Sequence, residues 1–355
     1  MAKVSIKTRG ARAKASRRPT IRDVSQLAGV SRMTVSRVIS DPSLVLPATR
    51  ERVLKAVADL GYVPDKAAGG LSSRKTGFIA LMLPTLTNAN FAAVAHGLTE
   101  ALRDADYHLL IAYTEYDMAE EERQLRNLLA RRPEAIVLTG ATHSREATKL
   151  LLSADIPVIE IADLPQNPIE HVIGFSNYQV GRTAARYLIG KGLTRIGAIG
   201  GKADGAVVDH RGEERVRGFE DELRHAELST EAVLRLGSAP LSYDHGTNAI
   251  ATLLERCPDT EAVFAVSDLS AVGAVMECQR RGIAVPDRLS IIGFGDFEIG
   301  RVINPPLTTI HVDFSGLGRR TGHSLIALLA SDGDAPPERV DVGLTIVERQ
   351  SVRSK

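Results

Sequence analysis

Several residue types and patterns are scarce or absent in this sequence of 355 residues. It has no tryptophan, 4% aromatic residues and only two cysteines, Cys257 and Cys278. Two cysteines exclude a disulfide scaffold and fit a reducing cytoplasm, although a single disulfide stays open, and their separation matches no metal or redox motif. No apolar run approaches the ~20 residues that cross a bilayer, and the first 20 residues lack the apolar core of a secretory signal. We therefore expect a cytoplasmic protein that does not enter a membrane.

The formal net charge is only +1, but the charges are unevenly distributed. Residues 1–75 contain 16 Lys and Arg against 5 Asp and Glu, whereas the remaining 280 residues contain 28 against 38. A basic head on an acidic body indicates a polyanionic partner, either nucleic acid or an anionic membrane. Residues 1–18 carry seven basic and no acidic residues, and we predict a disordered basic tail there, which could also be merely solubilising.

The pattern after the tail predicts a small domain of three helices over residues 19–65. Apolar residues recur at helical spacing over 21–28, 32–39 and 47–60. Residue types that favour helix ends bound these stretches: Thr20, Gly29, Ser31, Pro47 and Gly61. Two helices joined by a glycine turn, the second short and basic, are typical of a helix-turn-helix, although spacing alone leaves a generic three-helix bundle open.

Several motifs in this region stand in a fixed order. They are TIRDVSQLAGVSRMTVSRVI (20–39), TRERV (49–53), LGYVP (60–64) and AAGGL (67–71). In these motifs the sequence resembles the LacI/GalR family of bacterial repressors, and the resemblance extends over nearly the whole chain beyond the tail. It implies that the helical head binds double-stranded operator DNA.

The resemblance also implies roles for individual residues of the head. Arg32 and Met33 occupy the positions that open the recognition helix and read base edges, and Arg37 ends the same helix. Neighbouring polar residues resemble phosphate-contacting positions, which set the register on DNA. The expected DNA-binding residues are Thr20, Ser31, Arg32, Met33, Thr34, Ser36, Arg37 and Leu71. Leu46 departs from the small polar residue that often precedes the third helix, so a side-chain contact there is expected to be lost.

Residues 66–76 match the hinge of the family. In relatives this segment becomes a helix only on operator DNA and drives a leucine into the minor groove, and Leu71 is the matching leucine. Gly69 and Gly70 each disfavour a helix by about 1 kcal/mol relative to alanine, so we expect the hinge to fold only with DNA. A plain flexible linker is the alternative that the glycines also allow.

Residues 77–355 alternate short apolar runs with amphipathic helical stretches, which predicts an α/β core of parallel sheets flanked by helices. The apolar runs are 78–83, 108–113, 135–138, 157–161, 195–200, 262–266 and 289–294. The resemblance implies a two-lobed, periplasmic-binding-protein-like arrangement with crossing chains and an effector cleft between the lobes. By that analogy the first lobe is about 77–176 plus 309–337, and the second is about 177–308 plus 338–352.

Motifs in the core resemble the gluconate-operon repressor branch of the family. They are PTLTNANF (84–91), TGATHS (139–144), VIGFSN (172–177), MECQR (276–280) and GFGDFEIG (293–300). Members that bind neutral sugars usually carry an aspartate where Gly295 stands, and the loss of that carboxylate favours an anionic ligand. Arg211 matches an arginine retained in the branch and suits bidentate carboxylate binding, with Arg215 as the second choice.

The expected effector-binding residues are Asn88, Asn90, Phe91, Thr139, His143, Glu160, Arg211, Arg215, Tyr243, Asp268 and Asp296. Structural alternatives exist for several of them. Phe91 could belong to the core, His143 and Asp268 could cap helices, and Glu160 could lie at a lobe interface. The two arginines could also be solvated within a run of mixed charge.

Motifs for catalysis are missing from the core. The sequence has no G-x-x-x-x-G-K-[ST] phosphate loop, no G-x-S-x-G elbow and no H-E-x-x-H or paired-cysteine metal set. We therefore expect a homodimeric, ligand-controlled repressor without a metal or cofactor, and no leucine heptads follow Arg353 to suggest a tetramer. Three alternatives stay open: another effector such as 2-ketogluconate or idonate, an effector that promotes DNA binding, or a sugar-acid enzyme with an accessory DNA head.

Overall fold

The computed structural model describes residues 18–64, 76–202, 204–331 and 336–353. The chain divides into two compact units, Met1–Thr76 and Gly77–Lys355. Nearly all of the predicted tail and hinge, including Leu71, lies outside the described residues, so both stay predictions. None of the helices in the described part of the chain combines the length and apolar character that spanning a membrane requires.

The first unit contains the three predicted helices. They are α1 (Ile21–Ala28), α2 (Arg32–Ser40) and α3 (Pro47–Leu60), with a 3-10 turn, η1 (Pro42–Leu44), between the last two. The backbone N–H of Thr20 donates to the Asp23 carboxylate at 2.7 Å, and the Ser31 hydroxyl caps α2. Gly29 and Gly61 end α1 and α3 with φ of 64° and 60°, in the left-handed region that favours glycine.

A small core of valine and alanine holds these helices together. Its fully buried members are Val24, Ala28, Val35, Val38, Val53 and Ala56. Leu27 shares their helical spacing along the sequence but is 56% exposed. Val24 and Ala28, one turn apart, supply the buried stripe of α1, and Leu27 lies on its flank.

Leu46 stands at the N-cap of α3, makes no side-chain capping hydrogen bond and is 76% exposed. A serine there would accept a hydrogen bond from the first turn, so we expect Leu46→Ser to stabilise α3 by about 1 kcal/mol. Hydrogen exchange of the α3 amides in the full chain should slow about fivefold. Leu54→Ser, on the exposed surface of the same helix, is the matched control and should give no such protection. Equal exchange in both variants would contradict the capping argument.

The second unit contains two six-stranded sheets. The first has the strand order β11-β5-β4-β3-β1-β2 and is parallel throughout. Its strands are β1 (Phe78–Leu83), β2 (His108–Tyr113), β3 (Ala135–Thr139), β4 (Val158–Ile161), β5 (His171–Gly174) and β11 (Arg339–Asp341). The second has the order β12-β10-β9-β8-β6-β7, and only β12 is antiparallel to its neighbour. Its strands are β6 (Ile196–Gly200), β7 (Val233–Arg235), β8 (Ala262–Ala265), β9 (Ser290–Phe294), β10 (Thr308–His311) and β12 (Thr345–Val347).

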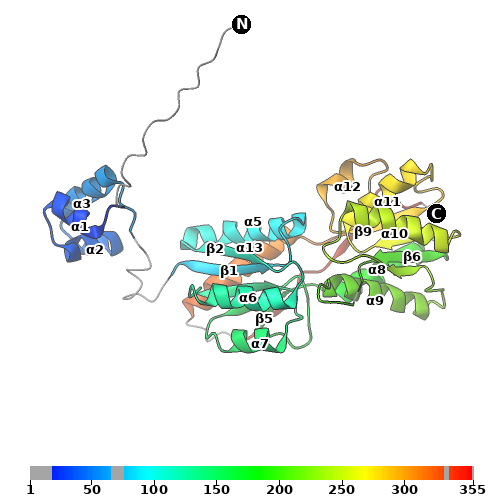
Figure 1. Ribbon diagram of the computed structural model, residues 1–355, viewed down its shortest axis with the longest axis horizontal. Helices are drawn as coiled ribbons and strands as arrows, with labels where there is room; N and C mark the ends of the chain where they lie inside the picture. Colours follow the sequence, from blue (N-terminus) through cyan, green and yellow to red (C-terminus); the bar gives the residue numbers. More distant parts are fainter. Residues whose placement is uncertain (1–17, 65–75, 203, 332–335, 354–355) are drawn as a thin grey trace, which may run out of the picture. The chain divides into compact units, whose positions relative to one another are not determined.

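Helices cover both faces of each sheet. Those of the first lobe are α5 (Ala89–Leu102), which continues into η2 (Arg103–Ala105), α6 (Met118–Leu129), α7 (Arg145–Leu152) and α13 (Phe314–Ala330). Those of the second are α8 (Asn177–Gly190), α9 (His210–His225), α10 (Tyr243–Arg256), α11 (Asp268–Arg280) and α12 (Glu298–Val302). In Figure 1, α5 and α13 lie on one face of the first sheet with α6 and α7 on the other, and α10 and α11 lie opposite α8 and α9 on the second. The predicted α/β architecture is therefore confirmed.

The lobe boundaries expected at 309 and 338 are wrong by a few residues. Hydrogen bonding places β10 in the second sheet, between β9 and β12, and places β11 in the first sheet beside β5. The chain therefore crosses between the lobes three times, after Gly174, after His311 and after Asp341. Strand pairing decides these boundaries, and it cannot be read from short strands with mixed polarity.

Candidate functional site

Helix α2 presents a polar surface on the side opposite the core of the first unit. Val35 and Val38 are buried, whereas Arg32 and Arg37 are exposed and Met33 is 65% exposed. Within the described residues, neither arginine forms an ion pair. Both guanidinium groups are therefore available to bases or phosphates, which fits the base-reading role expected for Arg32 and Met33.

The polar residues around α2 partly serve the helix itself. The Ser31 hydroxyl accepts the N–H of Thr34 at 3.1 Å and lies 2.9 Å from the Thr34 hydroxyl. The Thr20 hydroxyl donates to Asp23 at 2.7 Å, and Ser36 is exposed. Any phosphate contact from Thr20, Ser31 or Thr34 would therefore share a side chain that already stabilises a helix start.

A cavity of about 540 Å³ lies between the two lobes, and we call it the aromatic compartment. Its lining residues are Asn88, Asn90, Phe91, Tyr116, Ala162, Phe175, Asn177, Asp209, Arg211, Arg215, Leu241, Val266, Ser267, Phe294, Phe297 and Phe314. Five of the eight phenylalanines of the chain are among them. The rings of Phe175, Phe294 and Phe314 contact one another with centroids 5.8–6.3 Å apart, which gives the compartment a continuous apolar wall.

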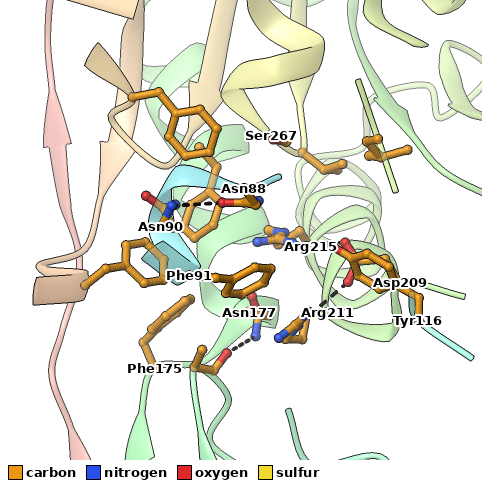
Figure 2. A pocket seen from close by; sticks show the side chains of 16 residues that line it. Asn88, Asn90, Phe91, Tyr116, Phe175, Asn177, Asp209, Arg211, Arg215 and Ser267 are labelled. Carbon is orange, nitrogen blue, oxygen red and sulfur yellow. Dashed lines mark hydrogen bonds and ion pairs between the residues drawn. The ribbon is translucent and has the colours of Figure 1, made fainter. Parts of the chain in front are cut away.

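Two arginines of α9 enter this compartment beside the aromatic rings (Figure 2). Arg211 and Arg215 are one helical turn apart, and each is only 8% exposed. The Arg215 guanidinium lies 4.4 Å from the centre of the Phe294 ring, and that of Arg211 lies 5.2 Å from the Phe91 ring. Burial lowers the pKa of Arg215 from its ordinary value. The wall therefore combines apolar rings with two desolvated cations, a combination suited to an anion with an apolar face.

The position of Arg215 depends on close packing between α8 and α9. A Cβ atom at Gly181 of α8 would lie 1.9 Å from the Arg215 carbonyl oxygen, and one at Gly218 would lie 2.0 Å from the Tyr178 carbonyl oxygen. Any side chain at either glycine would push the helices apart. The glycines thus allow α9 to lie against α8 with its arginines directed toward the cleft.

Asp209, which precedes α9, is the nearest carboxylate to both arginines. Its Oδ1 lies 3.7 Å from Arg211 Nε and its Oδ2 lies 3.5 Å from Arg215 Nη2, so the charges are only loosely paired. Five buried polar atoms around the cleft have no hydrogen-bond partner among the described residues: Thr139 Oγ1, Asn177 Oδ1, Asp209 Oδ1, Arg211 Nη1 and Arg215 Nε. Buried polar groups are almost always satisfied, so this cluster of donors and acceptors indicates a polar ligand site.

A second cavity of about 440 Å³ adjoins the first, and we call it the acidic compartment. Its lining residues are Pro84, Thr114, Tyr116, Asp117, Met118, Glu121, Thr139, Gly140, Ala141, Thr142, Asp163, Val208, Asp209, His210 and Arg211. Tyr116, Asp209 and Arg211 line both compartments, so the two form one continuous cleft.

The lobes contact each other beside this shared wall. The Val208 N–H donates to the Tyr116 carbonyl oxygen at 3.3 Å, and Asp117 forms a β-bridge with Val207. Glu115 and Tyr116 have φ of 50° and 62°, unusual for residues with side chains. Burial raises the pKa of the Tyr116 phenol, with the charge of Asp209 adding to the shift. Strained backbone at an inter-lobe contact is typical of a functional segment.

The structure brings together most of the residues expected in the cleft. Asn88, Asn90, Phe91, Arg211 and Arg215 line the aromatic compartment. Thr139 lines the acidic compartment, and His143 lines a cavity of about 220 Å³ that shares Thr139 and Glu121 with it. The remaining four, Glu160, Tyr243, Asp268 and Asp296, line neither compartment nor the cavity beside His143.

Two of these four residues have structural partners instead. Glu160 accepts the Ile169 N–H at 2.6 Å and lies 3.3 Å from His143, inside the first lobe. Asp296 pairs with Arg349 at 2.5 Å and with Arg301 at 3.0 Å. Both carboxylates therefore have partners within their own lobe, and their expected contact with the effector stays a prediction.

The other two residues, Asp268 and Tyr243, also lie outside both compartments. Asp268 accepts the Thr309 hydroxyl at 2.7 Å and the Phe297 N–H at 2.9 Å, and burial raises the pKa of its carboxyl to about 6. It therefore positions Phe297, which does line the aromatic compartment. Tyr243 is 43% exposed at the start of α10 and faces solvent.

Gly295 explains why no carboxylate stands beside the cleft at this position. Its φ is 128°, and a Cβ atom there would lie 2.7 Å from the Phe297 ring and 2.8 Å from the Asn90 amide nitrogen. Phe297 and Asn90 thus occupy the space that a side chain would need. With no side chain at position 295, no carboxylate stands there.

His143 is held in a buried carboxylate cluster at the edge of the cleft. Its Nδ1 lies 2.5 Å from Glu121 Oε1 and its Nε2 lies 3.3 Å from Glu160 Oε1. Burial alone lowers the pKa of His143, but the hydrogen bonds and charges of Glu121 and Glu160 outweigh it and raise the pKa to about 9. The cluster ties the loop after β3 to α6 and β4.

This raised pKa predicts a pH-dependent stability of the core. The histidine is protonated more readily in the folded chain, so its contribution is complete below pH 6.5 and is lost as the pH rises through about 9. Urea unfolding should show a loss of about 3 kcal/mol between pH 6.5 and 10 that is reduced in His143→Gln. His96→Gln, which removes an exposed histidine, should keep the full loss. A parallel loss in both variants would contradict the assignment.

Sequence reasoning missed most of the apolar wall of the aromatic compartment and four of its polar residues, Tyr116, Asn177, Asp209 and Ser267. A signal for part of this set was present, because ligands in α/β proteins bind beyond the carboxyl ends of parallel strands. Phe175 directly follows β5, Val266 and Ser267 follow β8, and Phe294 ends β9. Tyr116 and Asp209 come from longer loops, which that rule does not place.

The fold and the cleft together define a DNA-binding transcriptional regulator with a ligand-binding core. Residues 20–65 match the family described as bacterial regulatory proteins, lacI family, and residues 185–352 match a periplasmic binding protein-like domain. The regulators GntR and IdnR of Escherichia coli K12 are each 31% identical over 331 residues, which covers 93% of this chain and 97% of theirs. A LacI family regulator from Silicibacter pomeroyi, known from a crystal structure, is 31% identical over 94% of this chain and 99% of its own, with a TM-score of 0.87.

The chain belongs to the LacI family of bacterial regulatory proteins and resembles its GntR branch. The predicted family and fold are confirmed. Members of this family regulate transcription, so the alternative of a sugar-acid enzyme is set aside and the protein is a DNA-binding regulator.

Proposed function

We propose that the protein represses genes for the uptake or catabolism of a sugar acid, gluconate first among them, and leaves its operator when the acid binds between the lobes. The observation that carries this proposal is the pair of buried arginines, with unpartnered donors, in a cleft that also contains unpartnered acceptors. A ligand with a carboxylate alone would accept hydrogen bonds from the donors and leave the acceptors unused. A polyhydroxy acid would use the donors through its carboxylate and the acceptors through its hydroxyl groups.

In this proposal different residues of the cleft bind different parts of the ligand. Arg211 Nη1 and Arg215 Nε donate to the carboxylate, while Asn177 Oδ1 and Asp209 Oδ1 accept from hydroxyl groups. The C–H groups of the carbon chain lie on phenylalanine rings. Glucose, which lacks the carboxylate, would leave two desolvated cations without a partner and should bind poorly.

We further propose that the repressor is a cytoplasmic homodimer on a pseudo-palindromic operator. Large apolar side chains exposed on the core support self-association, which would bury them. They include Leu86, Ile111, Tyr113 and Met276, each more than 40% exposed. Effector binding would change the closure of the lobes and separate the two hinge segments of the dimer.

The hinge role of Leu71 stays a prediction. If its side chain enters the minor groove, Leu71→Ala should weaken operator binding by at least 10-fold without changing the affinity for effector, since wedge insertion supplies the bend that enlarges the DNA contact. Normal repression by this variant would contradict the hinge role.

The test of the proposed function is fluorescence anisotropy of labelled promoter DNA from a gluconate-uptake operon, at fixed salt, with the acid titrated in. Release by gluconate, with glucose inert, would support repressor, operator and effector together. Tight binding that gluconate does not alter would overturn the effector assignment, and 2-ketogluconate and idonate would be titrated next. Tighter DNA binding with the acid would reverse the sign of the coupling.

A further inference from the structure

The two compartments of the cleft carry opposite charge. The aromatic compartment is lined by two arginines and one carboxylate, that of Asp209. The acidic compartment is lined by one arginine, Arg211, and by four carboxylate side chains: Asp117, Glu121, Asp163 and Asp209. Glu121 is paired with His143, so Asp117 and Asp163 carry the negative charge that no cation of the compartment neutralises. His210, at the start of α9, also lines this compartment and is exposed. One ligand that extends through the shared wall therefore meets a positive end and a negative end.

The carboxylates of the acidic compartment are fixed by the fold. Asp117 Oδ1 accepts the Ala119 N–H at 2.7 Å and so caps α6. Asp163 Oδ1 accepts the Leu164 N–H at 2.9 Å and the Asn177 amide at 3.3 Å. Because these groups are held by hydrogen bonds, they cannot easily turn away from a ligand that enters between them.

We infer that the effector carries a single anionic group, bound against Arg211 and Arg215, and that its uncharged hydroxyl end occupies the acidic compartment. A ligand with a second anionic group at its far end would place that group among the carboxylates of Asp117 and Asp163. Like charges brought together in a partly desolvated site are costly, so aldaric acids and phosphorylated sugar acids should be rejected. This inference rests on the proposed function and adds that the same site selects ligands with one anionic group over ligands with two.

The test compares three acids that share one carbon skeleton: gluconate, glucarate with a second carboxylate, and 6-phosphogluconate with a phosphate. Isothermal titration of the full chain at pH 7.5 should show glucarate and 6-phosphogluconate binding roughly 30-fold or more weakly than gluconate. Equal or tighter binding of either dianion would overturn the inference while leaving a sugar-acid repressor intact. No binding of any of the three acids would overturn the proposed function and the inference with it.

A charge-removal variant tests which residues impose this selectivity. Asp117→Asn combined with Asp163→Asn keeps the side-chain oxygens that accept hydrogen bonds but removes two negative charges, so glucarate should gain at least 10-fold relative to gluconate. Asp104→Asn combined with Asp244→Asn removes two exposed carboxylates, one from each lobe, that line neither compartment. This control should keep the wild-type preference. An unchanged preference in the first variant would remove Asp117 and Asp163 from the selectivity role.

Discussion

Replacing Arg211 with alanine is expected to raise the Kd for gluconate about 100-fold, because a buried charged partner contributes several kcal/mol to an ion-paired ligand. Arg211 lines both compartments, and its Nη1 has no partner among the described residues. It is therefore the donor that can contact the ligand in both compartments. Operator binding without effector should be unchanged, so the variant would repress even when the acid is present. Isothermal titration and anisotropy would measure the two affinities separately.

The control for this prediction lies on the same helix. Arg217 pairs with Glu214 at 2.6 Å, is 56% exposed at its side chain and stacks over Tyr178, away from the cleft. Arg217→Ala removes the same charge and should leave the effector Kd within about twofold. Arg211→Lys keeps the charge but loses the planar fork, so an intermediate loss is expected. Wild-type affinity in Arg211→Ala would exclude this residue from the site.

Arg215 is a less informative target, although it lines the same compartment. Its guanidinium is packed on Phe294 and partly neutralises Asp209. Removing it would leave both a cavity and a buried carboxylate without a cation, which destabilises the fold as well as the site. A loss of effector binding in Arg215→Ala would therefore have two explanations. Arg211 is also 8% exposed and lies 3.7 Å from Asp209, so urea unfolding of Arg211→Ala is measured beside its effector affinity.

The head was predictable from sequence because its signals are local. Each helix begins and ends at residues whose own conformation decides the boundary, such as Gly29 and Gly61. The long apolar strands were predictable for the same reason. The strands β7, β11 and β12 have three residues each with mixed polarity, and only pairing with distant strands makes them strands.

The cleft was only partly predictable, because carboxylates acquire their role from distant partners. Asp296 was expected beside the effector, but Arg349 comes from the end of the chain and pairs with it. Glu160 meets His143 and the Ile169 amide only after β4 has joined the sheet. Asp209 was missed, although it lies just before the two arginines in the sequence and its carboxylate partly neutralises both guanidinium groups. Sequence motifs identified residues near the cleft and could not say which of them face it.

Replacing Arg32 with alanine is expected to weaken binding to the specific operator about 10- to 100-fold, the usual contribution of a bidentate guanine contact. The side chain is exposed at the first position of α2 and forms no ion pair among the described residues, so removing it should not disturb the fold of the first unit. Affinity for unrelated DNA should change much less. The operator would be obtained by in vitro selection with the wild-type protein, and both affinities would be measured by anisotropy.

The salt dependence separates base reading from phosphate contact at this residue. A base contact leaves the slope of log K against log salt nearly unchanged, whereas loss of a phosphate contact lowers the slope by about one. Lys55→Ala, on α3, removes one exposed positive charge from the same unit and is the matched control. If Arg32→Ala loses equal affinity for operator and unrelated DNA and also lowers the slope, the residue positions the backbone, and base recognition must then come from Met33 and Arg37. If only operator binding falls, at constant slope, Arg32 reads a base.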